Sequence, residues 1–161
     1  MAGDSKKFQI AMTHAKRFSE QGIWAEAIKA YRFALAEFPN DQGAIIGFGQ
    51  ATLSAGKVDM SRKAFEQALK LDPGNYQVLH YIAEIQEQTG RVDESAETHL
   101  RVGNILAAQE DLDGAIESWQ RATNLAPNHI DANHKIDKEN EHGKQRTDQP
   151  DGQDALSLPF H

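Results

Sequence analysis

The sequence predicts an all-α fold, an α-solenoid of antiparallel helix pairs with about seven helices. Three glycines, Gly22, Gly56 and Gly90, are evenly spaced along the chain. Between them, apolar residues recur three or four positions apart, as Ala64 and Ala68 do, which is the spacing of one helix face. A fixed period of about 34 residues is typical of repeat proteins, whose units bury their apolar faces against neighbouring units.

Other residue classes follow the same step as the glycines. The pairs are Tyr31 and Phe65, Ala34 and Ala68, Leu35 and Leu69, and Pro39 and Pro73. Each period glycine is expected to end a first helix in the left-handed conformation, and each proline to end a second one. The predicted helices cover residues 5–21, 24–37, 42–55, 58–71, 76–89, 92–109 and 112–125.

These marks resemble the tetratricopeptide repeat (TPR) family, whose unit has a small residue in its first helix, then an alanine, an aromatic residue and a closing proline. Unit 8–41 matches through Ala15, Phe18, Gly22, Ala27, Tyr31, Ala34 and Pro39. Unit 42–75 matches through Gly49, Gly56, Phe65, Ala68 and Pro73, with Ser61 and Thr52 departing from the pattern. The resemblance implies a right-handed superhelix and covers residues 8–129, within a TPR-like domain at 1–130.

The third unit begins at residue 76 and is shortened. The aromatic, small and proline classes expected at positions 99, 102 and 107 stand later in the chain, at Trp119, Ala122 and Pro127. Part of a unit is therefore missing, and the last unit, 96–129, overlaps the third. One helix at 92–109 is expected to pack on both neighbouring helices, with Trp119 touching it through Val102, Gly103 or Leu106. Glu110 stands where the hairpin glycine is expected.

Residues 131–161 form a polar, largely disordered C-terminal tail in this interpretation. They contain seven acidic and four basic side chains and few apolar ones, too few to offset the entropy of ordering. Residues 130 to about 141 have the composition of a fraying helix, and disorder is expected from Gly143. The apolar cluster at 155–160 is either a segment that docks into the groove of its own or a neighbouring molecule, or a bystander, which we favour.

Composition excludes several classes of function. The 161 residues contain 17 Lys and Arg against 24 Asp and Glu, a formal charge of −7, and no cysteine. An acidic chain offers no basic field to nucleic acid, and thiol chemistry is absent. No apolar stretch approaches the roughly 20 residues that cross a bilayer, and residues 1–10 lack the apolar block of a secretory signal. The sequence therefore predicts a cytoplasmic protein without nucleic-acid or membrane partners.

The resemblance implies that the first helices of successive units line a concave groove. The predicted peptide-binding residues stand at the positions of each unit that face the groove in this family. They are Met12, Lys16, Gly43, Ile46, Gly47, Gln50, Leu53, His80, Glu84 and Glu87. The same phase adds Gln9, Ser19, Gln77 and Tyr81. Such a groove runs from mildly basic through apolar to acidic.

Ile46 and Leu53 are seven residues apart and share one helix face, so they are candidates for an apolar peptide anchor. The alternatives are that neighbouring units partly cover them, or that they are ordinary isolated surface residues. Gly43 and Gly47 each cost about 0.5–1 kcal/mol relative to alanine inside a helix. Close approach of a ligand backbone and tolerated drift are equal explanations for the pair.

Many TPR adaptors grip the carboxyl terminus of heat-shock chaperones with a clamp of Lys, Asn and Arg at groove positions. The corresponding residues here are Met12, Lys16, Gly47, Gln77 and Tyr81. Only Lys16 is basic, and it stands where the clamp uses Asn, so the sequence predicts no chaperone clamp.

The sequence predicts no catalytic or metal site and no cofactor. His129 and His134 lie five residues apart, whereas two ligands on one helix face need a spacing of three or four. His14 and His99 occupy packing phases and are expected to be half-buried and hydrogen-bonded. Residues 43–49 have the glycines of a phosphate loop but lie in a helix without a following Lys-Ser/Thr. No nucleophile triad or carboxylate pair can be assembled.

We therefore expect a non-catalytic protein–protein interaction module that binds a peptide or helix of a partner protein. Glu84 and Glu87 at the acidic end favour a ligand whose apolar residue is flanked by Lys or Arg. One alternative is a self-assembling scaffold, which includes a weak homo-oligomer. The other is a regulatory subunit of a larger enzyme or secretion complex.

Overall fold

The computed structural model describes residues 2–128 and 130–147, and this part of the chain is helical, without strands. Eight helices follow one another: α1 (Ser5–Glu20), α2 (Trp24–Glu37), α3 (Gln42–Ser54), α4 (Val58–Leu71), α5 (Tyr76–Gln88), α6 (Val92–Ala108), α7 (Leu112–Leu125) and α8 (Ile130–Thr147). The predicted all-α solenoid is confirmed, and α1 to α7 end within one residue of the predicted bounds. The eighth helix brings the number in the described residues to one more than predicted.

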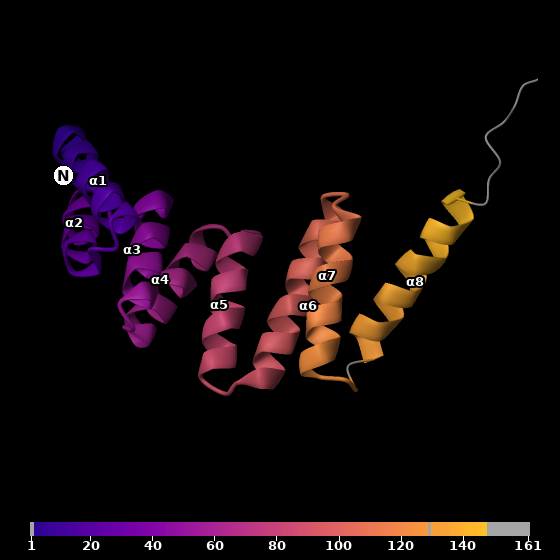
Figure 1. Ribbon diagram of the computed structural model, residues 1–161. Helices are drawn as coiled ribbons and strands as arrows, with labels where there is room; N and C mark the ends of the chain where they lie inside the picture. The colour runs from indigo at the N-terminus through magenta and orange to yellow at the C-terminus, as the bar shows by residue number, and fades with distance from the viewer. Residues whose placement is uncertain (1, 129, 148–161) are drawn as a thin grey trace, which may run out of the picture.

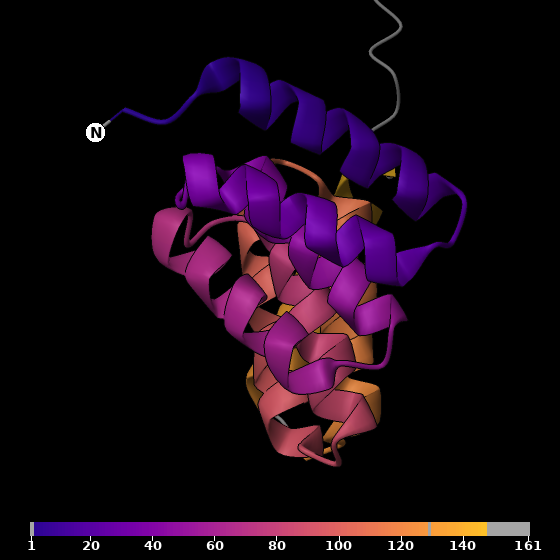
Figure 2. The ribbon, with the colours of Figure 1, turned by 90° about the vertical axis from the view of Figure 1, so that its left-hand side faces the viewer.

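The helices stand in a row, each packed antiparallel against the next, from α1 at the N-terminal end to α8 (Figures 1 and 2). Successive stretches of this row share three apolar clusters. The first lies between α1, α2 and α3, the second between α3, α4 and α5, and the third between α5, α6, α7 and α8. The core is thus a series of apolar interfaces (packing seams) between neighbouring helices, as the repeat period predicts.

The turns inside the helix pairs use a left-handed residue. Gly22, Gly56 and Gly90 have φ between 70° and 76°, and Glu110 has φ 65° at the equivalent turn between α6 and α7. Glutamate therefore adopts a conformation that a side chain disfavours, because the chain must reverse there.

Helix starts alternate between two types. Asp4, Asp41, Asn75 and Asp111 accept backbone N–H groups at the starts of α1, α3, α5 and α7. The residues that precede α2, α4 and α6 make no such side-chain cap. Each cap satisfies first-turn N–H groups and fixes the helix start.

The shortened unit has the predicted consequence. Residues 92–108 form one helix, α6, which packs against both α5 and α7. The indole ring of Trp119 lies against the backbone of Gly103, where a Cβ would collide with it. Its Nε1 donates to Oδ1 of Asn104 at 3.2 Å. The predicted contact of Trp119 with the shared helix is therefore confirmed.

Helix α8 covers the far side of α7. Ala132 is fully buried there and Ile136 packs against the same cluster, while Lys135 Nζ lies 5.7 Å from the Trp119 ring centroid. The helix continues to Thr147, so the expectation that disorder begins at Gly143 is wrong. Residues 148–161, with the apolar cluster at 155–160, lie outside the described residues.

Candidate functional site

The structure places most predicted groove residues at the surface of α1, α3 and α5. Exposed members are Gln9, Lys16, Gly43, Gln50, Gln77, His80 and Glu84. Half-buried members are Ser19, Ile46, Leu53, Tyr81 and Glu87. The remaining two, Met12 and Gly47, are buried.

Met12 and Gly47 belong to packing seams, so their assignment to the ligand-facing groove is wrong. Met12 is 9% exposed and lies in the cluster that joins α1, α2 and α3. At Gly47, a Cβ would collide with the ring of Tyr31 from α2. The glycine is therefore explained by the approach of Tyr31 and not by a ligand backbone. At Gly43 no ring comes so close, because the atom nearest to an added Cβ would be Oδ1 of Asp41, at 3.3 Å.

The outer surface between α3 and α5 combines apolar and polar groups. Ile46 and Leu53 pack against the cluster that contains Phe65, and both stay partly exposed. Gln50 donates to the hydroxyl of Tyr81 at 2.8 Å, and the Tyr81 ring stacks on Phe65 with centroids 4.8 Å apart. Neighbouring units thus partly cover the aliphatic pair, as one of the alternatives anticipated.

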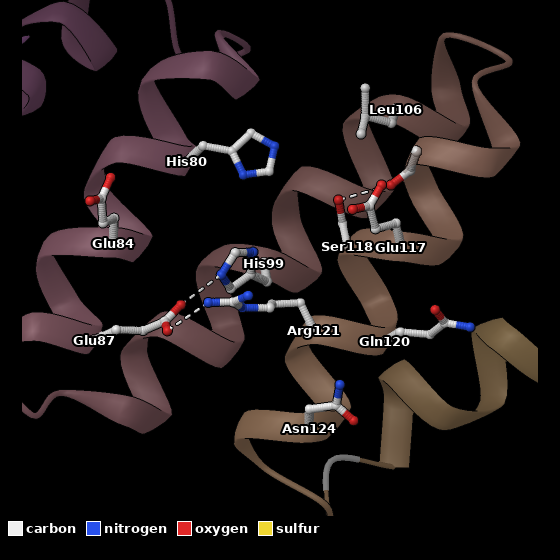
Figure 3. A pocket seen from close by; sticks show the side chains of 11 residues that line it. His80, Glu84, Glu87, His99, Leu106, Glu117, Ser118, Gln120, Arg121 and Asn124 are labelled. Carbon is white, nitrogen blue, oxygen red and sulfur yellow. Dashed lines mark hydrogen bonds and ion pairs between the residues drawn. The ribbon is translucent and has the colours of Figure 1, made fainter.

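Glu87 is turned toward α6 and α7. Its carboxylate accepts from Arg121 Nη2 at 2.9 Å and from His99 Nε2 at 3.2 Å (Figure 3). Burial acts to raise the pKa of Glu87, but the hydrogen bonds and charges of Arg121 and His99 outweigh it and lower that pKa below its ordinary value. Glu87 is therefore already paired within the chain, and Glu84 is the exposed carboxylate of the predicted acidic end.

A polar groove of about 690 Å³ lies between α5, α6 and α7. In Figure 3, α5 and α7 stand on either side of it, and His99 projects from α6 between them. The lining residues are His80, Glu84, Glu87, His99, Leu106, Gly114, Glu117, Ser118, Gln120, Arg121 and Asn124. We call this feature the α5–α6–α7 groove.

His99 is the buried polar group of this groove. Its side chain is 9% exposed, and because Glu87 can only accept, Nε2 carries the proton that joins them. Burial lowers the pKa of His99, against the opposing effect of Glu87, so the ring is neutral near pH 7. Nδ1 is then a bare acceptor, and it has no hydrogen-bond partner in the described part of the chain.

His99 and His14, which the sequence predicts to be half-buried and hydrogen-bonded, differ in their surroundings. His99 is hydrogen-bonded as predicted, although it is buried rather than half-buried. His14 is exposed and makes an edge contact with Phe18, so its predicted half-burial is wrong. His80 lies over His99 with ring centroids 5.9 Å apart, and burial lowers its pKa while Glu117 acts to raise it.

The described residues contain no group of three His, Asp or Glu side chains arranged to hold a metal ion. In the same part of the chain, no helix is both long and apolar enough to cross a membrane. What the α5–α6–α7 groove offers is hydrogen bonding and charge, from three glutamates, one arginine and two histidines.

The sequence interpretation missed the half of this groove that α7 contributes. A comparison of the last unit with the second, aligned on their aromatic residues, could have revealed these α7 residues. Trp119 matches Phe65 in that alignment, whereas Arg121, Ser118 and Glu117 stand where the second unit has Gln67, Ala64 and Lys63.

Comparisons with known proteins agree with this fold. Two family models, both described as tetratricopeptide repeat, match residues 46–102 and 96–129. Together they span more than half of the 161-residue chain. The chain belongs to the tetratricopeptide repeat family. The two matches overlap at 96–102, inside α6, and the second has the bounds expected for the last unit.

Among solved structures, the TPR2B domain of yeast Sti1 in complex with pHsp70 is similar over 76% of this chain and 98% of its own, with 19% identity and TM-score 0.66. MamA from Desulfovibrio magneticus RS-1 is similar over 91% and 90%, at 18% identity and TM-score 0.56. YrrB, described as a TPR protein with an unusual peptide-binding site, is similar over 82% of this chain and 75% of its own, at 16% identity and TM-score 0.53. These likenesses establish the fold.

A relative by sequence is the protein CTR9 homolog of Arabidopsis thaliana. It is 35% identical over 60 residues, which is 37% of this chain and 6% of that protein. The chain thus spans a small fraction of the length of this relative.

Proposed function

We propose that this chain is a non-catalytic interaction module that binds a peptide or helix of a partner protein across the surface of α3 and α5. The observation that carries the proposal is the partly exposed pair Ile46 and Leu53, one helix face on α3, beside the Gln50–Tyr81 hydrogen bond. Aliphatic groups bordered by polar ones suit an amphipathic segment. Two proteins of similar fold, one in complex with pHsp70 and one described as having an unusual peptide-binding site, support a protein ligand.

The charge beside this pair sets the expected polarity of the ligand. Glu84 is exposed on α5, whereas Glu87 is neutralised by Arg121. A ligand with an apolar residue flanked on one side by Lys or Arg therefore matches the surface, and Glu84 fixes its direction. At the chaperone-clamp positions only Lys16 is an exposed base, so a chaperone tail is not the ligand we propose.

The test is the affinity of a partner isolated with the intact chain for variants of this surface. The Ile46→Asp/Leu53→Asp variant is expected to weaken binding by a few kcal/mol, because it removes apolar burial and introduces unpaired charge. Leu71→Asp/Val92→Asp adds the same charge at other exposed apolar sites and is expected to leave affinity unchanged. Ile46→Ala/Leu53→Ala keeps the test valid if the aspartates unfold α3. Unchanged affinity in folded variants would contradict the proposal.

A second candidate function is self-assembly through the α1–α2 end of the solenoid. Phe33 and Ile10 are 72% and 50% exposed there and line a hollow of about 320 Å³. The residue one period after Ile10 is Ala44, which is fully buried. A second copy that covers this face would give a molecular mass that rises with concentration. A constant monomer mass by light scattering across the micromolar range would refute self-assembly.

A further inference from the structure

The α5–α6–α7 groove lies where a regular repeat has a packed seam. In the second unit, α2 lies against the α3–α4 pair, and Leu35 of α2 lines the residual hollow of about 260 Å³ with Ile45 and Ala64. In the last unit, α6 and α7 form the equivalent pair, but α6 also serves the third unit. The helix that precedes α6 is therefore α5, a first helix, and it stands where a second helix is expected.

The side chains on the α6–α7 pair have changed with this arrangement. At equivalent positions of the two units, Ile45 is replaced by His99, Ala64 by Ser118 and Met60 by Gly114. Apolar or bulky groups have thus given way to polar or small ones. The resulting hollow is about 690 Å³ instead of 260 Å³. Residues that depart from the repeat pattern in this way are ones that the packing of the repeat does not require.

The charge of the groove selects a cation. Its lining contains three glutamates and one arginine, and Arg121 is engaged with Glu87. The carboxylates of Glu84 on α5 and Glu117 on α7 have no basic partner in the described residues, and both residues are exposed, although Glu84 accepts a hydrogen bond from Nε2 of Gln88 at 3.1 Å. A positively charged group between them is attracted from both sides.

His99 points independently to a ligand with N–H donors. It is buried, its Nε2 is bonded to Glu87, and Nδ1 is left without a partner in the described part of the chain. Figure 3 shows this second nitrogen turned away from Glu87, with His80 over the ring. His80 is exposed and no hydrogen bond fixes it within the described residues, so its ring can move aside. An unmade hydrogen bond at a buried acceptor is costly, and a donor that reaches it gains correspondingly.

We propose that the α5–α6–α7 groove binds the guanidinium of an arginine side chain on the partner segment, with one N–H donated to Nδ1 of His99 and with the acidic lining, Glu84 and Glu117, attracting its charge. The proposal rests on the proposed function, because this arginine is the basic flank of the bound segment. A guanidinium presents five N–H donors in a planar fork, so it can donate to an imidazole nitrogen and still offer a pair of donors to a carboxylate. The ammonium of lysine is a compact point charge without this fork, so it cannot present two parallel N–H donors to one carboxylate.

The test uses N-acetyl-arginine amide, whose side chain carries its only charge, titrated into the intact chain. Histidine ring signals followed by NMR report the site directly. The expected result is a saturable shift of the His99 Nδ1 and His80 signals. N-acetyl-citrulline amide, which has nearly the same shape without the charge, should bind at least about tenfold more weakly, because charge-assisted hydrogen bonds are the stronger ones.

Variants assign the site. Glu84→Gln/Glu117→Gln should lower the affinity for the arginine amide by about tenfold or more. Glu20→Gln/Glu141→Gln removes the same charge from exposed positions on α1 and α8 and should leave affinity unchanged. The absence of a saturable His99 shift, or equal loss in both double variants, would overturn the proposal. Equal affinity for N-acetyl-lysine amide would overturn the assignment to arginine.

The two proposals fail separately. The arginine titration involves no partner protein and none of the aliphatic residues on α3. If the amide binds but Ile46→Asp/Leu53→Asp leaves partner affinity unchanged, the α3–α5 surface is wrong and the groove stands. If partner binding depends on Ile46 and Leu53 but the amide does not bind, the groove assignment is wrong.

Discussion

Trp119 and Gly103 are in direct contact, the indole ring of α7 lying on the backbone of α6 where any side chain would collide with it. The same contact joins Phe65 to Gly49 at the equivalent positions of the second unit. The last pair of helices is therefore packed like a regular TPR unit, although the chain that leads to it is shorter than a full period. Regular packing and a shortened chain are compatible because helix α6 belongs to both the third and the last unit. The α5–α6–α7 groove is a consequence of this shared helix.

This contact predicts that Gly103→Ala destabilises the protein. Alanine gains about 1 kcal/mol of helix propensity over glycine, but displacing a packed ring costs roughly 1–3 kcal/mol. We expect a net loss of up to about 2 kcal/mol in the free energy of unfolding, measured with urea. Gly143→Ala is the matched control, because its Cβ meets nothing within 4 Å on α8, and there the substitution should be neutral or slightly stabilising. Equal or greater stability of Gly103→Ala would show that the ring contact is not close.

The turn between α6 and α7 predicts a stabilising substitution. Glu110 has φ 65°, and a side chain in that region costs roughly 1–2 kcal/mol relative to glycine. Part of this gain is offset by the greater freedom of glycine in the unfolded chain. We expect Glu110→Gly to raise the free energy of unfolding by about 0.5–1 kcal/mol. Gln109→Gly, at φ −92°, should destabilise or be neutral, and a gain there equal to that of Glu110→Gly would remove the conformational explanation.

His99 predicts a pH dependence of stability. Its pKa is lowered in the folded protein by burial, so between that pKa and the ordinary value of about 6.5 the unfolded chain binds more protons. Stability should therefore fall as pH decreases below about 6.5 and level off once the folded-state pKa is passed. The groups that face the ring are Glu87 and His80 from α5 and Arg121 from α7.

His80 acts in the same direction, since its pKa is lowered by burial against the effect of Glu117. Glu87, with a lowered pKa, adds a loss of stability only at lower pH, as that carboxylate becomes protonated. Urea unfolding from pH 8 to pH 5 measures the slope, and His99→Gln should reduce it because glutamine does not titrate. An unchanged slope in His99→Gln would assign the effect to other groups.

Most of the fold follows from the sequence because turn residues and packing residues share one period. Gly90 and Pro73 mark helix ends through local conformation, and the displaced Trp119 reveals the shortened unit. The length of α8 was underestimated, since its polar sequence carries little sign of the contacts that Ala132 and Ile136 make with α7.

The candidate site was less predictable, because it depends on which helices meet. The burial of Gly47 depends on Tyr31 reaching it from the preceding helix pair, and nothing local to α3 indicates this contact. The engagement of Glu87 by Arg121 depends on α5 and α7 standing on either side of α6. The position of a residue within one repeat predicts which helix face it occupies. The shared helix α6 changes which neighbouring helix packs against that face.

A partner segment bound across α3 and α5 would shield the backbone amides of both helices from solvent. Hydrogen exchange of these amides, measured with and without the bound partner, is the decisive measurement. We expect protection to increase around Ile46 to Leu53 on α3 and around Glu84 on α5, and not on α2 or α4. Protection confined to α2 and α4, or to the α1–α2 end near Phe33, would contradict it.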